Sequence, residues 1–295
     1  MSALSTDFDR AALGRVYEQT IAGEYLRFTR HWVAIGGTGH VSERLGGTEQ
    51  TPAVTTAGPP GSVISFSVGF GLDGPIEPAV IDRAEELHRS MGGDPVFEVS
   101  PYADPSYPAE LKRRGYVLRE LLHTFYLPMV EPPDLPMPEG VRVERVDKSD
   151  PAMLGRAIRA NASGREHVSG SADDPPSELA LGIAGCVISC PENATFAAYL
   201  DDEDRIAGVA TCGLWDHPLA AGHMNLYQGS TMPFARRRGV QLALMLARLR
   251  WGFGEGSRSA SLDCLPGVAS ERNAARAGFG LLYTKPVLTA GFDGS

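Results

Sequence analysis

The sequence contains no long apolar run. No stretch approaches the roughly 18–20 apolar residues that a membrane-spanning helix needs. The first residues, MSALSTDFDR, include acidic side chains and lack the apolar segment of a secretory signal. We therefore expect a cytoplasmic protein with no membrane partner.

Cysteine is also scarce, with four residues in the whole chain. Cys186 and Cys190 form a single C-x3-C pair without a second pair or a neighbouring histidine cluster, so we expect no metal site. All four cysteines are expected to be small buried residues in a reducing compartment.

The sequence also lacks G-x-x-x-x-G-K-[S/T] and a full G-x-G-x-x-G after a strand, which excludes the common nucleotide-binding loops.

Basic residues are in the minority, since 27 Lys and Arg stand against 36 Asp and Glu and give a net charge of −9. Nucleic acids and anionic membranes bind concentrated basic surfaces, so neither is an expected partner. A content of 43% hydrophobic and 21% charged residues is typical of a globular protein. The acidity serves solubility first and only weakly favours an amine-bearing substrate.

A proline-rich segment divides the 295 residues in two. Five prolines between Pro128 and Glu139 exclude a regular helix and a central strand, as is typical of an extended linker. We predict an N-terminal domain of residues 1–129, a linker of 130–139 and a C-terminal domain of 140–295. Each domain is long enough to bury a core of its own.

The two halves resemble one another. Each contains a strand, a loop, a short helix, a glycine–aromatic pair and a last strand, and the pairs are Gly115-Tyr116 and Gly278-Phe279. Glycine at such a place closes a helix in the left-handed conformation. The recurrence at about half the chain length indicates a repeated fold.

Hydrophobic periodicity predicts a mixture of helices and strands, and therefore an α+β fold. Helices are expected at Ala11–Arg30, Glu77–Ser90, Pro151–Ala162, Glu178–Ala184, Gln241–Gly252 and Ser270–Ala277. Strands are expected at Val63–Phe70, Val141–Val146, Thr195–Leu200, Arg205–Leu214, His223–Thr231 and Ser259–Leu265.

The most informative stretch is the predicted turn between a strand ending near Thr231 and Met232 and the helix that begins after Gly239. A glycine-containing turn at a helix start presents unpaired backbone N–H groups and the positive end of the helix dipole to a phosphate. Three consecutive arginines, Arg236, Arg237 and Arg238, add charge for a diphosphate. The pattern predicts a diphosphate-binding site.

Here the chain resembles the GNAT acetyltransferases, whose signature is [Q/R]-x-x-G-x-[G/A] between the fourth strand and third helix. Arg236 and Gly239 match it, while Gln241 departs from the usual Gly or Ala. Asn273 stands where many members bind the pantetheine arm. The resemblance covers about residues 140–292 and extends through the repeat to 10–128. It implies two tandem GNAT-like domains, each a mostly antiparallel mixed sheet flanked by helices, with acetyl-CoA or another acyl-CoA bound by Thr231, Met232, Arg236, Arg237, Arg238, Gly239, Val240, Gln241, Leu242 and Asn273.

The N-terminal half lacks this turn chemistry. After its strand come Gly71, Asp73, Gly74 and Glu77, with no arginine before the glycine. The two carboxylates would repel phosphate. We therefore expect a degenerate copy that forms a scaffold and a wall of the substrate cleft.

Amide formation from a thioester requires a base for the amine, donors for the oxyanion and a proton for the thiolate. Candidate bases are His223 and Tyr227, which share one face of a strand, and Asp216 and His217 in the preceding hairpin. His167 is a further candidate for lining the acceptor site. The tyrosine that many GNATs use as acid is replaced by Ala274, which leaves Tyr283, Ser270 or water as substitutes.

The sequence therefore predicts an N-acyltransferase that acts on a primary amine of a small molecule, as a monomer or homodimer. The alternative is a non-catalytic or regulatory CoA-binding protein. Acceptor specificity is expected in the loops at 161–192 and 213–223 and at the face between the halves.

Overall fold

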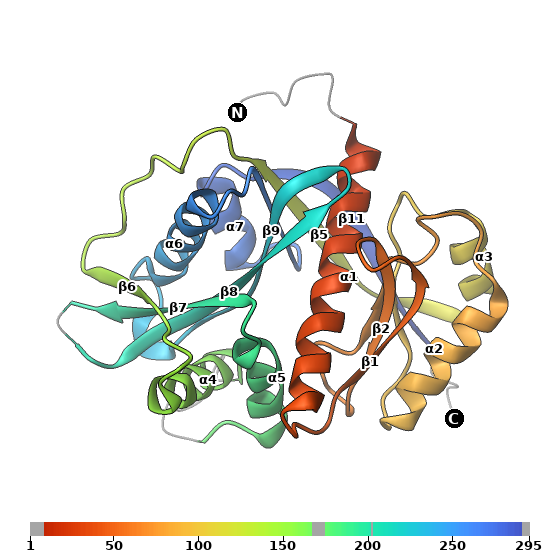
Figure 1. The fold of residues 1–295 in the computed structure, drawn as a ribbon, viewed down its shortest axis with the longest axis horizontal. Helices are drawn as coiled ribbons and strands as arrows, with labels where there is room; N and C mark the ends of the chain where they lie inside the picture. The colour runs from red at the N-terminus through yellow and green to blue at the C-terminus, as the bar shows by residue number, and fades with distance from the viewer. Residues whose placement is uncertain (1–8, 167–174, 202, 291–295) are drawn as a thin grey trace.

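The structure is a computed structural model of the chain and describes residues 9–166, 175–201 and 203–290. Its centre is one continuous sheet of eleven strands in the order β1-β2-β3-β4-β11-β5-β10-β9-β8-β7-β6. Helices cover both faces of this sheet (Figure 1). The predicted α+β class is thus confirmed, whereas the two halves are not clearly separate domains.

The N-terminal half contains three helices and five strands. The helices are α1 (Arg10–Ala34), α2 (Pro78–Ser90) and α3 (Ser106–Arg113). The strands are β1 (Val41–Gly47), β2 (Pro52–Ala57), β3 (Phe66–Val68), β4 (Val96–Glu98) and β5 (Tyr116–Pro128). The sequence analysis missed β1 and β2, and the strand predicted at Val63–Phe70 is shorter in the structure.

The C-terminal half follows the predicted order of elements. Its strands are β6 (Val141–Arg145), β7 (Asn193–Leu200), β8 (Ile206–His217), β9 (Ala220–Thr231), β10 (Ser259–Cys264) and β11 (Gly280–Ala290). Its helices are α4 (Pro151–Glu166), α5 (Glu178–Ser189), the short 3-10 helix η1 (Pro233–Ala235), α6 (Val240–Gly254) and α7 (Ala269–Arg276).

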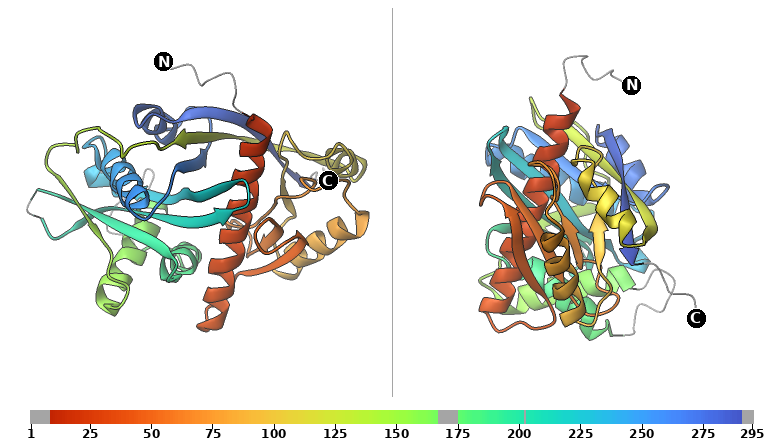
Figure 2. Two further views of the ribbon diagram at one scale, coloured as in Figure 1. Left: turned by 45° about the horizontal axis from the view of Figure 1, so that its top comes forward. Right: turned by 90° about the vertical axis from the view of Figure 1, so that its right-hand side faces the viewer.

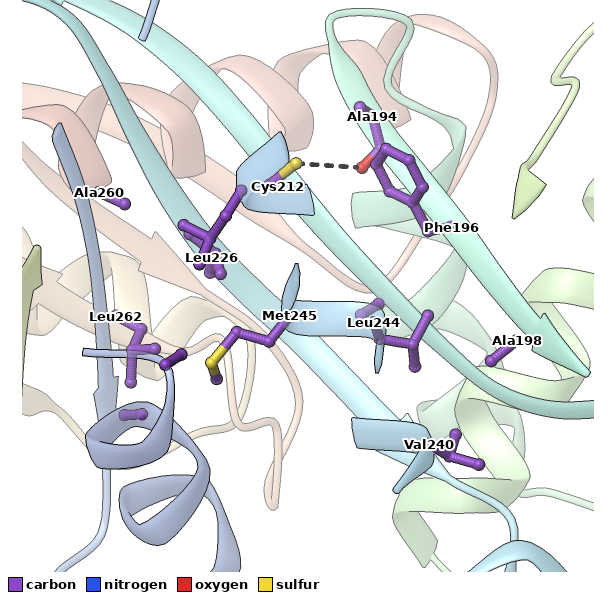
Figure 3. Close-up of a cluster of buried hydrophobic side chains, with 14 of the residues drawn as sticks. Ala194, Phe196, Ala198, Cys212, Leu226, Val240, Leu244, Met245, Ala260 and Leu262 are labelled. Carbon is purple, nitrogen blue, oxygen red and sulfur yellow. Dashed lines mark hydrogen bonds between the residues drawn. The ribbon is translucent and has the colours of Figure 1, made fainter. Parts of the chain in front are cut away.

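The helices form two layers with the sheet between them. On one face, α1 packs on the N-terminal strands while α4 and α5 pack on β7 and β8. On the other face, α2 and α3 cover the N-terminal half and α6 and α7 the C-terminal half. Figure 2 shows α1 crossing the middle of the molecule between the two groups of elements. In Figure 3, Val240, Leu244 and Met245 of α6 pack against Ala198, Leu226 and Leu262 of the strands.

The two halves exchange their last strands at the centre of the sheet. Strand β11 inserts between β4 and β5, and β5 inserts between β11 and β10. The flanking pairs are equivalent: β4 with β11 and β10 with β5 are antiparallel, whereas β3 with β4 and β9 with β10 are parallel. The order of connections therefore recurs on both sides of the β5–β11 pair.

A buried charged cluster lies where these central strands meet α1. The ammonium group of Lys285 on β11 lies 2.5 Å from Glu98 and 3.0 Å from Glu18. Burial alone lowers the pKa of Lys285, but the surrounding carboxylates raise it above its ordinary value. The cluster ties α1, β4 and β11 together at the boundary between the halves.

The proline-rich segment lies against the C-terminal half. The guanidinium of Arg250 on α6 donates to the carbonyl oxygens of Pro133 and Leu135. The domain boundaries predicted around it stay a prediction. Among the described helices, none is long and apolar enough to cross a membrane.

Candidate active site

The candidate site lies where two parallel strands separate. Strands β9 and β10 pair only from His223 to Asn225, opposite Ser259 to Ser261. Beyond this point β9 has an irregularity, where Gln228 takes a φ of 53° and the pairing with β8 shifts. Bulges bend strands and end regular pairing. The separation opens the sheet toward the start of α6.

The turn after β9 leads into α6 through two left-handed residues. Arg237 has a φ of 63° and Gly239, the N-cap of α6, has a φ of 81°. No side chain caps the helix, so the first amides, beginning at Val240, have no partner within the helix. A Cβ atom on Gly239 would lie 2.5 Å from the Cβ of Pro138. Glycine is thus required here by the backbone conformation and by the proline-rich segment.

An arginine-lined cleft of about 790 Å³ runs along this turn. Five arginines line it, and no carboxylate of the described residues does. Arg165, Arg272 and Arg276 were not predicted from the sequence. The cleft brings together eight of the predicted cofactor-binding residues: Thr231, Arg236, Arg237, Gly239, Val240, Gln241, Leu242 and Asn273.

Two other predicted residues do not line the cleft. Met232 is buried in the core, and its amide donates to the carbonyl of Ala207 at 2.9 Å. Because amides alternate in direction along an antiparallel pair, the amide of Thr231 points away from β8 and toward the separation. Of these two residues, only Thr231 therefore presents its amide to the cleft. Arg238 is exposed and forms a 2.9 Å ion pair with Asp201.

Gln241, the departure from the GNAT signature, connects α6 to α7. Its amide nitrogen donates to the hydroxyl of Ser270 at 2.7 Å, and its amide oxygen accepts from Asn273 at 2.7 Å. Ala274 is fully buried in the core. The hydroxyl residue of α7 is Ser270, one turn before Ala274, and it lines the cleft.

A smaller inner cavity of about 250 Å³ adjoins the cleft, and both share Arg165, Gly229, Gln241 and Ser270. Its wall includes Asp263 on β10, whose Oδ2 accepts a 2.5 Å hydrogen bond from the hydroxyl of Tyr17. Sequence reasoning missed Asp263. The available signal was a single carboxylate in the otherwise uncharged strand SASLDC.

His223 lies away from both cavities, contrary to its predicted role as a base. It is fully buried, with its ring nitrogens 2.8 and 2.7 Å from the hydroxyls of Ser259 and Ser261. Burial lowers its pKa to about 3, so the imidazole stays neutral near pH 7. We interpret His223 as part of the packing between β9, β10 and β5, where its ring stacks with that of Tyr126.

Tyr227 shares a face with His223, as predicted, and lines the inner cavity. Its hydroxyl, however, donates to the side-chain oxygen of Asn193 at 2.7 Å. Burial raises its pKa well above the ordinary value. This geometry is that of a positioned wall residue and argues against a base.

The remaining predicted catalytic residues also lie outside both cavities. Asp216 is exposed in the hairpin, whereas His217 is buried and lies 2.9 Å from the side-chain oxygen of Gln19. Burial lowers the pKa of His217. Tyr283 donates to the carboxylate of Glu18 on α1 at 2.5 Å and lines neither cavity. His167 lies outside the described residues.

The comparisons with known proteins rest on structure alone. No family model matches the chain, and no curated protein matches it in sequence. A GCN5-related N-acetyltransferase from Kribbella flavida matches with a TM-score of 0.52 and 15% identity over 92% of this chain and 95% of its own. One from Sphaerobacter thermophilus matches with a TM-score of 0.53 and 16% identity over 95% and 92%.

The chain has the GNAT fold. A tandem GNAT protein from the clavulanic acid biosynthesis pathway also matches, with a TM-score of 0.51 and 15% identity over 72% of this chain and 69% of its own. At these identities the likeness shows the fold alone.

The described residues include no group of three or more His, Cys, Asp or Glu side chains placed to hold a metal ion. The expectation that the protein uses no metal stays a prediction.

Proposed function

We propose that the protein is an acyl-CoA-dependent N-acyltransferase that acts on a primary amine of a small molecule. The observation that carries this proposal is the arginine-lined cleft. In a chain with a net charge of −9, five arginines gather around the unpaired amides of a helix start without a described carboxylate. Such a site fits the phosphates of a coenzyme A thioester.

Different residues of the site would bind different parts of the acyl-CoA. Arg236, Arg237 and the first amides of α6 would hold the diphosphate, and Arg272 and Arg276 would add charge at the outer wall. The acyl group would then lie toward the inner cavity, with the amide of Thr231 positioned for the carbonyl oxygen. Acetyl-CoA is the proposed donor, and a longer acyl-CoA would use the same binding mode.

The reaction is direct transfer. The protonated amine loses one proton to a base, the neutral nitrogen attacks the thioester carbonyl carbon, a C–N bond forms, and the C–S bond breaks. The leaving thiolate takes up the second proton of the amine, so that the products are an amide and free CoA. We propose Asp263 as the base, directly or through water, because it is the carboxylate that lines the inner cavity. Ser270 or water would deliver the proton to the thiolate.

We further propose that the N-terminal half is a degenerate copy of the same domain. The recurring connections around the β5–β11 pair support a duplication. In this half the loop after β3 is bridged to the loop after β4, since the amide of Asp104 donates to Gly71 at 2.7 Å and that of Ile76 donates to Ser106 at 2.9 Å. These bonds occupy the place where the other half has its cleft.

A second candidate function is CoA binding without catalysis, which the buried Ala274 at the usual tyrosine position favours. Calorimetric titration with CoA and acetyl-CoA tests the part that both proposals share. A screen of primary amines for released thiol then separates them. Binding with thiol release supports the enzyme, binding without release from any amine supports the regulatory protein, and absence of binding overturns both.

A further inference from the structure

The inner cavity is built by both halves of the chain. Tyr25 of α1 and Val63 and Ile64 of the loop before β3 close it from the N-terminal side. Arg165 of α4 and Asp263 of β10 belong to the C-terminal half. A volume of about 250 Å³ is below the roughly 300–1,000 Å³ of cavities that hold drug-sized ligands. The cavity therefore suits a small acceptor.

Asp263 offers one carboxylate oxygen to this cavity. Its Oδ2 accepts from Tyr17 and lies 3.9 Å from the ammonium group of Lys285. Neither contact uses Oδ1. The side chain is about one-third exposed, whereas Lys285 is fully buried. The fixed carboxylate is thus open to an ammonium group from the cavity side.

Arg165 on α4 brings the opposite charge to this cavity. One of its amino groups donates to the side-chain oxygen of Gln228 at 2.6 Å. Within the described ranges, no carboxylate forms an ion pair with it. Burial lowers its pKa, which indicates that the guanidinium lacks a compensating anion. A guanidinium has five N–H donors, so several remain for a ligand.

Arg248, the other arginine of this cavity, differs in this respect. It donates to the backbone carbonyls of Leu244 at 3.0 Å, Thr211 at 2.9 Å and Tyr227 at 3.4 Å. These contacts are all to backbone carbonyls, and Arg248 thus serves to connect α6 with β8 and β9. Arg248 is also buried, whereas Arg165 is partly exposed and has one hydrogen bond to the described residues, so Arg165 is the cation better placed to bind a ligand.

We infer that the acceptor is a small zwitterion, such as an α-amino acid, whose ammonium group binds Asp263 and whose carboxylate binds Arg165. This inference rests on the proposed acyltransferase function and narrows its substrate class. Asp263 takes the proton that the ammonium group loses before the nitrogen attacks the thioester. A planar guanidinium binds a carboxylate with two parallel hydrogen bonds, which fixes the acceptor against the acyl group.

The test compares acceptors that differ in one charged group. Thiol release from acetyl-CoA is measured with a panel of α-amino acids, their decarboxylated amines and their methyl esters. We expect kcat/KM for the preferred amino acid to exceed that of its matched amine and ester by about 10- to 100-fold, the effect of one charge-assisted pair. Equal rates across the series overturn the inference and leave the acyltransferase proposal standing.

Two variants test which charged side chain binds which charged group of the acceptor. Arg165→Gln should lower kcat/KM for the amino acid by about 10- to 100-fold and leave the matched amine unchanged, while Asp263→Asn should lower both. Arg159→Gln, an exposed position on the same helix, is the matched control and should change neither. Thermal unfolding checks that each variant is folded. If Arg165→Gln instead weakens CoA binding and affects both acceptors equally, Arg165 serves the donor and the inference is wrong.

A binding measurement separates this inference from the proposed function. The amino-acid panel is titrated by calorimetry into protein saturated with CoA. Binding that Arg165→Gln abolishes supports the zwitterion site even if no thiol is released, in which case only the catalytic proposal fails. Absence of binding by every amino acid, together with thiol release from simple amines, overturns the inference alone.

Discussion

The turn from β9 to α6 and the turn from β3 to α2 occupy equivalent places in the two halves, but they differ in charge and in closure. The first carries consecutive arginines and a left-handed glycine cap and opens on a cleft. The second has Glu77 as N-cap and is bridged to the following loop through Gly71. We therefore expect this connection to bind phosphate only where charge, free amides and space coincide.

Reversing the charge of the C-terminal turn is the most severe test of this comparison. Each charge-assisted hydrogen bond to phosphate contributes about 1.5–3 kcal/mol. We therefore expect the Kd for CoA to rise at least about 100-fold in the Arg236→Glu/Arg237→Glu variant. Calorimetry measures the affinity and should give one CoA per chain in the unaltered protein.

The N-terminal turn supplies the control. Asp73→Asn/Glu77→Gln removes two negative charges there, and we expect neither a second CoA nor a change in the first, because the bonds at Gly71 and Ile76 already close the loop. A stoichiometry of two in either protein would contradict the contrast between the halves.

Gly239→Ala tests the backbone shape of the turn from β9 to α6 rather than its charge. The left-handed conformation costs an alanine about 1–2 kcal/mol, and the contact with Pro138 adds about 1–3 kcal/mol of overpacking. We expect a loss of about 2–5 kcal/mol in the free energy of unfolding, measured with urea. Gly256 has a φ of 96° and open space around it, so Gly256→Ala should show only the cost of the left-handed conformation.

A double variant isolates the cost of the contact between the alanine Cβ and Pro138. Replacing Pro138 by glycine removes the atom that an alanine Cβ would meet. Pro138→Gly/Gly239→Ala should therefore recover part of the stability lost in Gly239→Ala when each is compared with its own background. No recovery would mean that the proline-rich segment does not constrain the turn.

Glu24 tests how the junction between the two halves depends on pH. It lies where α1 meets β8 and β9. Burial raises its pKa to about 7, against the opposing charge of Arg27. The folded state then holds the proton more tightly than the unfolded chain, so its stabilisation is complete below pH 4.5 and is lost as the pH rises to 7. The loss amounts to at most about 3 kcal/mol.

Urea unfolding between pH 4 and pH 8 measures this dependence. In Glu24→Gln the slope attributable to Glu24 should disappear, and the variant should gain on the wild type as the pH increases. Glu77→Gln, an exposed position, should leave the profile unchanged. Because buried His40 and His88 have lowered pKa values of about 4 and act in the opposite direction, the difference between the two profiles is the quantity to compare.

Arg238→Ala should give the smallest effect. Its guanidinium pairs with Asp201 at the surface, and exposed pairs contribute about 0–1 kcal/mol. We expect CoA affinity to change less than about threefold. A loss comparable to that of the Arg236 and Arg237 double variant would show that all three arginines act on the donor.

Much of the C-terminal half could be predicted because its signals are local. A long apolar helix after a glycine fixed the place of α6, and the arginines before it marked the cleft. In the N-terminal half, β1 was missed because its sequence, VSERLGG, has charges and glycines in place of regular alternation. The exchange of β5 and β11 was also missed, because strand pairing at long range leaves no trace in local periodicity.

The structure brings most of the predicted cofactor-binding residues to one cleft but does not bring the predicted catalytic residues together, for a similar reason. His223 and Tyr283 were selected by residue type, yet partners from β10 and α1 bury them. Arg165 and Asp263 come from elements about 100 residues apart, and no spacing rule connects them. Which polar groups face one cavity depends on tertiary packing, which the sequence pattern does not contain.

The exchanged central strands also constrain how the molecule assembles. Strand β11 is the last of the eleven to leave the ribosome, yet it lies in the middle of the finished sheet, between β4 and β5. Until it arrives, the edges of β4 and β5 are unpaired, and exposed edges invite wrong partners. We expect an N-terminal fragment that ends at residue 129 to remain incompletely folded, because the strand that joins β4 to β5 is supplied by the other half.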